Sequence, residues 1–100
     1  MAIKVFIKRK VKPEHIKEAY QLVTRARYEA MKQRGYISSE TLTGIDEPKT
    51  VLVVSMWKSI ESWNDWKDSP SRSEIETEFE KLLDHPTEYE AFALGVQIPE

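Results

Sequence analysis

The sequence predicts an α+β fold of the ferredoxin-like type, in which a four-stranded antiparallel sheet carries helices on one face. Three features predict it. Residues 2–11 alternate between apolar and charged side chains, which is typical of a strand. An amphipathic stretch of about five helical turns follows, and residues 50–58 form an apolar strand in mid-chain. The predicted elements read β-α-β-β-α-β, and we expect a single domain, residues 1–100.

The first strand and the first helix follow from two different periods of apolar side chains. In the strand, every second side chain is apolar except Arg9: Ile3, Val5, Ile7 and Val11. Pro13 suits the first turn of a helix, because its missing N–H has no partner there. The helical positions recur at spacings of three and four: Ile16, Ala19, Tyr20, Val23, Ala26, Arg27, Ala30 and Met31. Gly35 is predicted to close this helix in the C′ position.

Residues 36–45 and 50–58 predict a β-hairpin, because the turn residues 46–49 separate them. Strand 50–58 is apolar on both faces. Its side chains alternate between Val51, Val53 and Trp57 on one face and Leu52, Val54 and Met56 on the other. Helices cover only one face, so the simplest cover for the other is the same sheet of a second copy. The sequence therefore predicts a homodimer through the sheet face, unless the strand keeps exposed aliphatic side chains.

The C-terminal part of the chain predicts two helices. Ser59 is placed to cap a short helix that contains Trp63 and Trp66, and Ser69-Pro70 breaks that helix. Ser71 and Glu74 form a capping-box pattern that opens the next helix. Its inner face consists of Ile75, Phe79, Leu82 and Leu83.

A last strand follows the second of these helices. His85-Pro86 ends the helix, because the residue before a proline disfavours helical backbone. Residues 88–97 then predict the strand, with Phe92, Leu94 and Val96 on one side.

The composition argues against several classes of partner and site. The net charge of −2 and pI of about 5.7 argue against nucleic-acid binding, which usually needs a strongly basic domain. No stretch approaches the ~20 apolar residues that span a bilayer, so no membrane partner is expected. The absence of cysteine excludes disulfides, thiolate catalysis and iron–sulfur clusters. Met1–Lys4 lead directly into the alternating pattern rather than a signal-peptide layout, so we expect a cytosolic protein.

Several stretches of the sequence together resemble one family. They are Val54-Ser55-Met56-Trp57-Lys58-Ser59, Trp63-Asn64-Asp65-Trp66 with Ser69 beyond it, Gly35-Tyr36, and Val11-Lys12-Pro13. They resemble the antibiotic biosynthesis monooxygenase (ABM) superfamily. In that family a strand ends in Trp-x-Ser, a short helix with an aromatic residue follows, and a Ser-Pro-like break precedes the next helix. The resemblance covers nearly the whole chain and implies a dimeric α+β barrel.

The resemblance also implies a choice of chemistry. The family includes cofactor-independent oxygenases that act on quinol-like or anthrone-like aromatics, haem-degrading enzymes, and members with no established activity. The haem-degrading branch uses an asparagine, a tryptophan and a histidine. Trp66 matches the tryptophan, but the other positions fall on Ile7 or Lys8 and on or near Glu76. Because haem iron needs a donor such as imidazole nitrogen, we do not expect haem degradation, and the expected activity needs no cofactor.

Three tryptophans, Trp57, Trp63 and Trp66, lie within ten residues. As functional residues they would form the aromatic wall of a pocket between sheet and helices and would hold a flat ligand. The alternative is that they simply pack on the core. For Trp66 the family resemblance adds weight to the functional interpretation.

Polar residues on predicted inner faces are further candidates. Arg9 on the first strand and Arg27 on the first helix either pair with a phenolate or carboxylate of a ligand or reach solvent. Tyr36 either donates a hydrogen bond to a ligand oxygen or packs as a strand aromatic. Glu76 either acts as base to a phenolic substrate or belongs to a solvated acidic face. Met31 and Phe79 complete the predicted pocket lining.

The two histidines do not predict a metal or triad site. His15 lies in the first turn of the long helix, and His85 lies at a helix end. Neither has a partner at i, i+4 or a carboxylate at ligand spacing, so no metal site is predicted. Neither has the Ser or Cys partner of a nucleophilic triad.

Two functions from different classes remain. The first is a small dimeric oxygenase whose electron-rich phenol or quinol substrate reduces oxygen directly once deprotonated, with Trp63 and Trp66 as pocket wall. The second is a non-catalytic homodimer that binds a small apolar ligand, or a stress-related protein of the same fold. A deep cavity beside Trp66 favours the first, and a cavity filled by Met31, Phe79 and Trp63 favours the second.

Overall fold

The computed structural model describes residues 1–96 and residue 98. Within them, strands, a 3₁₀ turn and helices follow one another in the predicted order. They are β1 (Ile3–Lys10), η1 (Pro13–His15), α1 (Ile16–Ala30), β2 (Tyr36–Thr43), β3 (Thr50–Trp57), α2 (Ile60–Lys67), α3 (Pro70–Glu80) and β4 (Glu88–Ala93). The second helical segment of the βαββαβ pattern is thus divided into α2 and α3.

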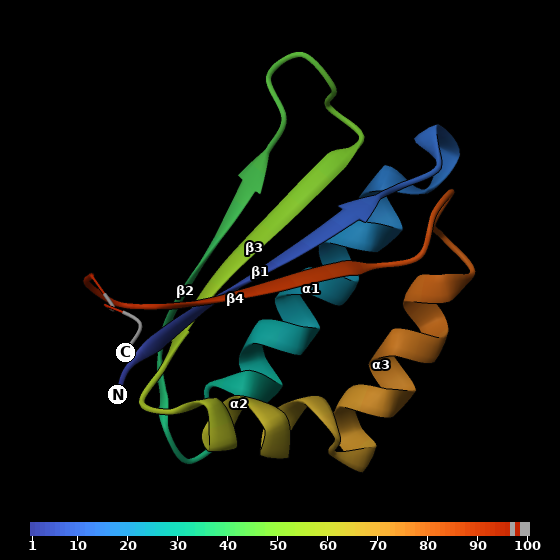
Figure 1. Cartoon of the computed structure of the whole chain (residues 1–100). Coiled ribbons are helices and arrows are strands. Elements are labelled where there is room, and N and C mark those ends of the chain that lie inside the picture. The colour runs from blue at the N-terminus through green and yellow to red at the C-terminus, as the bar shows by residue number, and fades with distance from the viewer. Residues whose placement is uncertain (97, 99–100) are drawn as a thin grey trace.

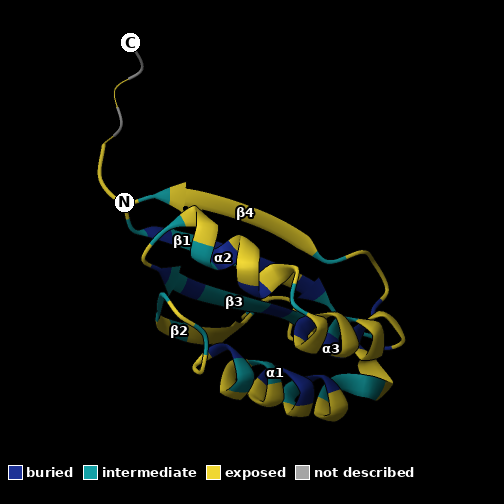
Figure 2. Ribbon diagram, turned by 90° about the horizontal axis from the view of Figure 1, so that it is seen from below, coloured by how far each residue is buried: buried dark blue, intermediate teal, exposed yellow. Residues whose placement is uncertain are grey.

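The strands form one antiparallel sheet in the order β2-β3-β1-β4. The three α-helices lie on the same side of this sheet, so one face is covered and the other is open (Figure 1). Buried residues concentrate between the helices and the two central strands, whereas β4 at the sheet edge is exposed along most of its length (Figure 2). The predicted ferredoxin-like α+β fold is confirmed.

The end of the first helix differs from the prediction. α1 ends at Ala30 and Met31 is its C-cap, so Gly35 is not in the C′ position. Gly35 instead turns the chain into β2 with a φ of 89°, a conformation that favours glycine. A Cβ at this position would also clash with the side chain of Ser62 on α2. Gly35 therefore allows the start of β2 to approach α2 closely.

The start of α3 also differs from the prediction. Its N-cap is Ser69, whose hydroxyl accepts a hydrogen bond from the backbone N–H of Arg72 at 3.2 Å. The predicted capping box of Ser71 and Glu74 is wrong, because Pro70 already occupies the first helical position, where its missing N–H has no cost. The cap of α2 is as predicted, since the Ser59 hydroxyl accepts from the N–H of Ser62.

The last helix and strand are shorter than predicted. α3 ends at Glu80, and Leu82 and Leu83 are buried beyond it, with Leu83 bridged to Val11. β4 ends at Ala93, and Gly95 then adopts a φ of 78°. Residue 97 of the predicted strand 88–97 lies outside the described residues.

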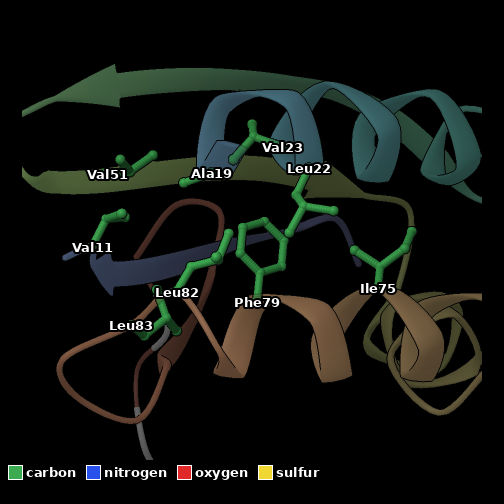
Figure 3. Packing of buried hydrophobic residues seen from close by; sticks show 9 residues of the cluster. All are labelled: Val11, Ala19, Leu22, Val23, Val51, Ile75, Phe79, Leu82 and Leu83. Atoms are coloured by element: carbon green, nitrogen blue, oxygen red, sulfur yellow. The ribbon is translucent and has the colours of Figure 1, made fainter. Parts of the chain in front are cut away.

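Two hydrophobic clusters fill the space between sheet and helices. The aliphatic cluster lies where β1 ends and β3 begins, and the ring of Phe79 points from α3 toward α1 within it (Figure 3). Its buried members are Val11, Ala19, Leu22, Val23, Val51, Ile75, Phe79, Leu82 and Leu83. The tryptophan cluster lies toward the opposite ends of these strands and consists of Ile3, Val5, Ile7, Ala30, Trp57, Trp63 and Trp66.

The open face of the sheet carries apolar side chains on all four strands. From the strand registers they are Phe6, Leu42, Leu52, Val54, Met56 and Phe92. The rings of Phe6 and Phe92 meet edge to face with centroids 5.3 Å apart, and Phe92 is 48% exposed. β3 therefore presents apolar side chains on both faces, as residues 50–58 predict, and within the described residues only the inner face is covered by helices.

Candidate functional site

A small cavity lies between the sheet and the helices, beside Trp66. Its volume of about 40 Å³ accommodates only roughly two or three water-sized groups, since each needs about 10–15 Å³. Three kinds of side chain give the cavity its character. They are aromatic (Tyr36, Trp57, Trp63, Trp66), hydroxyl-bearing (Ser39, Thr41, Ser55) and charged (Arg9, Arg27, Arg72, Glu76). The remaining lining side chains are aliphatic (Ile7, Val23, Ala26, Ala30, Val53), so the cavity is mostly apolar and has a small number of polar groups.

The aromatic side chains form a continuous wall. Trp57 is fully buried at the end of β3, and its indole Nε1–H donates to Ser55 Oγ at 3.0 Å. Its ring meets those of Tyr36 and Trp63 with centroids 5.6 and 5.9 Å away. Trp63 and Trp66 lie three residues apart on α2, so both point from the same side of the helix into the core. The buried contacts fix the orientation of these rings.

An ion-pair network closes the cavity on the side of α3. Arg9 Nη2 donates to Glu76 Oε1 at 2.5 Å, and Arg72 Nη2 lies 3.2 Å from the same oxygen. Arg72 Nη2 also donates to the hydroxyl oxygen of Tyr89 at 2.7 Å. The side chains of Arg9 and Arg72 are only 4% and 7% exposed, and that of Glu76 is 17% exposed. Two buried guanidinium groups therefore share one carboxylate.

Arg9 occupies a core position of β1, because it continues the alternation of buried residues along that strand. Its guanidinium carbon lies 3.9 Å from the centroid of the Phe79 ring, a cation–π contact. Burial lowers the pKa of the Arg9 guanidinium, and the Glu76 carboxylate opposes that shift. Arg9 Nε is buried and makes no hydrogen bond with any residue of the described part of the chain. One N–H of this buried cation is therefore unused by the protein.

Comparison with known proteins places the chain in a family. A family model described as "Antibiotic biosynthesis monooxygenase" matches residues 2–78. The chain belongs to the antibiotic biosynthesis monooxygenase family. None of the curated proteins compared with the chain matches it.

Solved structures show the same fold over nearly the whole ABM chain. A conserved protein from Methanosarcina mazei Go1 is 27% identical, with a TM-score of 0.86 over 92% of this chain and 91% of that one. Rv0793 from Mycobacterium tuberculosis is 13% identical, with a TM-score of 0.86 over 99% and 100%. SnoaB, a cofactor-independent oxygenase from Streptomyces nogalater, is 16% identical, with a TM-score of 0.83 over 99% and 98%. At such low identity the last two show likeness of fold alone.

Most of the residues predicted for the site of this ABM protein line the one cavity: Arg9, Arg27, Tyr36, Trp57, Trp63, Trp66 and Glu76. Tyr36 is half-buried there, and its hydroxyl lies 2.7 Å from Ser39 Oγ. Two predicted residues do not line the cavity. Met31 is 56% exposed at the C-cap of α1, and Phe79 is fully buried in the aliphatic cluster, where its ring lies against Arg9.

Sequence reasoning missed Arg72 and Tyr89. Arg72 precedes Glu76 by four residues on α3, and this spacing of opposite charges is a signal that the sequence does contain. Tyr89 approaches the network because β4 pairs with β1, which sets Tyr89 opposite Ile7. That pairing joins residues far apart in the chain, so no local pattern predicts it.

A larger groove lies on the other side of the ion-pair network. Its volume is about 830 Å³, and the end of α3, the loop after it and Tyr89 of β4 contribute to its lining. Arg72 and Glu76 line both this groove and the small cavity. These two side chains therefore form a partition between the two spaces.

The positions that matter for haem and metal binding have other surroundings. Ile7 is buried in β1, Lys8 is exposed, and Glu76 is paired with arginines. Among residues 1–96 and 98, no group of three or more His, Asp or Glu side chains is arranged to hold a metal ion. None of the helices in this part of the chain has the length and apolar character needed to cross a membrane.

Proposed function

We propose that this ABM family member is a cofactor-independent monooxygenase that acts on a quinol-like or polycyclic phenolic substrate. The observation that carries the proposal is one cavity that combines an aromatic wall with buried guanidinium groups. The wall suits a flat ring, and nearby positive charge favours the ionised form of a phenol. The structural relative SnoaB is described as a cofactor-independent oxygenase, which supports the same chemistry.

Electron counting defines the reaction class. A ring CH₂ group para to a ketone, as in an anthrone, loses a proton to a base, and the resulting phenolate-type anion transfers one electron to O₂. The radical pair then combines into a C–O bond, and the hydroperoxide loses water to leave a carbonyl. The substrate supplies all the electrons that O₂ accepts, because one oxygen atom enters the carbonyl and the other leaves as water. No separate reductant is required.

Each role has a candidate among the residues that line the cavity. Trp63 and Trp66 orient the ring, and Arg9 and Tyr36 stabilise negative charge on oxygen. Among the described residues, Glu76 is the one carboxylate in the lining of this cavity, and it is our candidate for the base. Its hydrogen bond from Arg9 holds it in place before substrate binds.

The small volume of the cavity favours a second candidate, a non-catalytic homodimer that binds a small ligand. A cavity of about 150 Å³ accommodates benzene, whereas this one has about 40 Å³. The oxygenase therefore requires side chains to move before a ring enters, whereas the second candidate does not. The two functions differ in whether the partition of Arg72 and Glu76 opens.

Turnover distinguishes the two candidates. The purified protein, treated with EDTA, would be supplied with anthrone in ¹⁸O₂, and oxygen uptake and the mass of the product would be measured. We expect anthraquinone that contains one ¹⁸O atom, and we expect Trp66→Ala to abolish turnover while the oligomeric state persists. Arg25→Gln is the matched control, because Arg25 pairs with Glu78 on the exposed surface. A wild-type rate equal to the rate without protein, for anthrone and for a panel of quinols, would leave only the second candidate.

The open sheet face supports a homodimer in both candidates. Its apolar side chains lie among lysines of β1 and glutamates of β2 and β4, so a two-fold-related copy can cover the apolar groups and pair opposite charges. Native mass spectrometry should give a dimer for the wild type. Val54→Glu, which places a charge in the middle of this face opposite Phe6, should give a folded monomer. A wild-type monomer at tens of micromolar would contradict the dimer.

A further inference from the structure

The charged residues that line the small cavity are unbalanced in sign. Three are arginines (Arg9, Arg27, Arg72) and one is a glutamate (Glu76). The whole chain has a net charge of −2, so this positive excess is local. Two of the arginines are more than nine-tenths buried, where water cannot offset their charge.

The buried excess includes an open hydrogen-bond donor. Arg9 Nε is buried without a partner, although its Nη2 donates to Glu76. Buried donors in native proteins are almost always paired, and Arg9 is one of the residues that line the cavity, so a ligand oxygen that reaches this N–H would supply the missing acceptor. The cavity volume of about 40 Å³ matches one oxygen-bearing group and excludes a whole ring.

A place for a ring exists next to this donor. The guanidinium carbon of Arg72 lies 5.3 Å from the Trp63 ring and 5.2 Å from the Tyr89 ring. Arg72 thus occupies an aromatic surface at the border between the cavity and the 830 Å³ groove. An aromatic body that displaces Arg72 from these two rings would extend from the cavity into the groove.

We propose that the site selects ligands that carry a full negative charge on oxygen, a carboxylate or an ionised phenol attached to an aromatic body. The anionic oxygen accepts the N–H of Arg9 Nε, and the ring replaces Arg72 on Trp63 and Tyr89. This inference rests on the proposal that the cavity is the substrate site, and it adds the charge of the substrate and the atom that recognises it.

Glu76 competes electrostatically with such a ligand, because its carboxylate neutralises the same guanidinium groups through their Nη2 atoms. In the structure its Oε1 accepts from Arg9 and pairs with Arg72. Removal of the Glu76 charge should therefore strengthen the binding of an anion. A purely structural network predicts the opposite sign, because the same substitution would only disturb the walls of the site.

The first experiment compares two ligands of the same shape, 2-naphthoate and its neutral amide 2-naphthamide. A third ligand, 2-naphthol, tests whether a phenol is recognised as well. Calorimetry should give a Kd for 2-naphthoate at least about tenfold below that of 2-naphthamide, the ratio for one charged hydrogen bond. In ¹⁵N–¹H spectra the Arg9 Nε–H signal, assigned by its loss in Arg9→Met, should shift with 2-naphthoate and not with the amide. Equal affinities, or an unmoved signal at saturation, would overturn the proposal.

Variants test the roles of the individual residues. Arg9→Met should remove the preference for 2-naphthoate, and Glu76→Gln should tighten 2-naphthoate about tenfold while it leaves 2-naphthamide within about twofold. Arg25→Gln should change neither affinity, because Arg25 lies away from the cavity, where it pairs with Glu78 at a distance of 2.6 Å. Circular dichroism would confirm the fold of each variant, and if Arg9→Met does not fold, Arg9→Lys, which also lacks the Nε–H group of arginine, assigns the signal in its place. Weaker anion binding in a folded Glu76→Gln variant would contradict the competition.

The monooxygenase proposal and the anion-site proposal can each be contradicted without the other. Selective binding of 2-naphthoate without any oxygen uptake would contradict the monooxygenase and leave the anion site in place. Turnover of anthrone without selective binding of anions would support the monooxygenase and overturn the anion site. If ionised 2-naphthol, measured at a pH above its own pKa, also binds more tightly than 2-naphthamide, the site recognises any anionic oxygen. If ionised 2-naphthol does not bind more tightly than 2-naphthamide, the ligands of the site are restricted to carboxylates.

Discussion

The aliphatic cluster and the tryptophan cluster lie between the same sheet and the same helices, yet they are built differently. The buried members of the aliphatic cluster are almost all Val, Leu, Ile and Ala, with the ring of Phe79 at their centre (Figure 3). The tryptophan cluster adjoins a cavity with hydroxyl groups, three arginines and a glutamate. The buried Arg9 connects the two clusters, because its side chain lines this cavity and its guanidinium packs on the ring of Phe79.

We infer from this difference that the aliphatic cluster serves stability and that the cavity beside the tryptophan cluster serves the proposed function. Close packing of aliphatic groups stabilises a fold without further requirements. Buried ion pairs are weak evidence for stability, because desolvation offsets much of their attraction. A fold that retains Arg9, Arg72 and Glu76 in its core therefore keeps them at a cost, which a role in ligand binding would explain.

Phe79→Ala should have the largest effect on stability. Phe79 is fully buried in the aliphatic cluster, and truncation of a buried Phe to Ala destabilises proteins by about 3–5 kcal/mol. The ring also lies 3.9 Å from the Arg9 guanidinium, so the variant should loosen Arg9 as well. Urea unfolding followed by tryptophan fluorescence would measure the loss.

The exposed Tyr28 provides the control for this prediction. Tyr28→Ala removes a ring that is mostly in solvent and should change the free energy of unfolding by less than about 0.5 kcal/mol. A loss below about 1.5 kcal/mol for Phe79→Ala would mean that the aliphatic cluster collapses around the vacancy. The contrast between the two ends of the core would then be smaller than the static structure indicates.

The sequence predicts this architecture well where the signal is local. The two-residue period of β1 and the three-to-four-residue period of α1 are enough to define both elements, but the buried face of α1 includes Leu22 and leaves Arg27 and Met31 exposed. The α3 cap was missed because Ser69 and Ser71 are both plausible caps, and only the fit of Pro70 at the first helical position decides between them.

The candidate site was predictable in most of its members and not in its connections. Arg9 and Glu76 are candidates by residue type and by the face they occupy, but 67 residues separate them, and no pattern in either segment pairs them. The volume of the cavity depends on how whole side chains pack, so the sequence does not give it. Tyr89 enters the network only through the non-local pairing of β4 with β1.

Arg9→Met should have a smaller effect than Phe79→Ala, and of opposite sign. Burial lowers the pKa of Arg9 in the folded state, so the charged guanidinium subtracts stability at every pH below that folded value. Because arginine stays protonated throughout the neutral range, a gain of about 1 kcal/mol should be nearly constant from about pH 5 to 9. Chemical unfolding at several pH values would measure it.

Glu76→Gln is the counterpart of this variant. It leaves Arg9 and Arg72 buried without a carboxylate and should destabilise by about 3 kcal/mol, whereas in Arg9→Met the Glu76 carboxylate still pairs with Arg72. Destabilisation by both variants would show that the ion pair of Arg9 and Glu76 is a net stabilising contact. The tryptophan cluster would then serve stability, as the aliphatic cluster does, and the excess of arginines in the cavity would no longer support an anion site.

Met31→Ser should have the smallest effect of these variants. It tests whether the ligand site extends beyond the end of α1. The helical period places Met31 beside Arg27 on the inner stripe, but α1 ends at Ala30 and the Met31 side chain is 56% exposed. The substitution should change the free energy of unfolding by less than about 0.5 kcal/mol. It should also leave the calorimetric Kd for 2-naphthoate within about twofold. A tenfold weaker Kd without a change in stability would mean that the ligand-bound cavity extends past the end of α1, because Met31 then contacts the ligand and not the core.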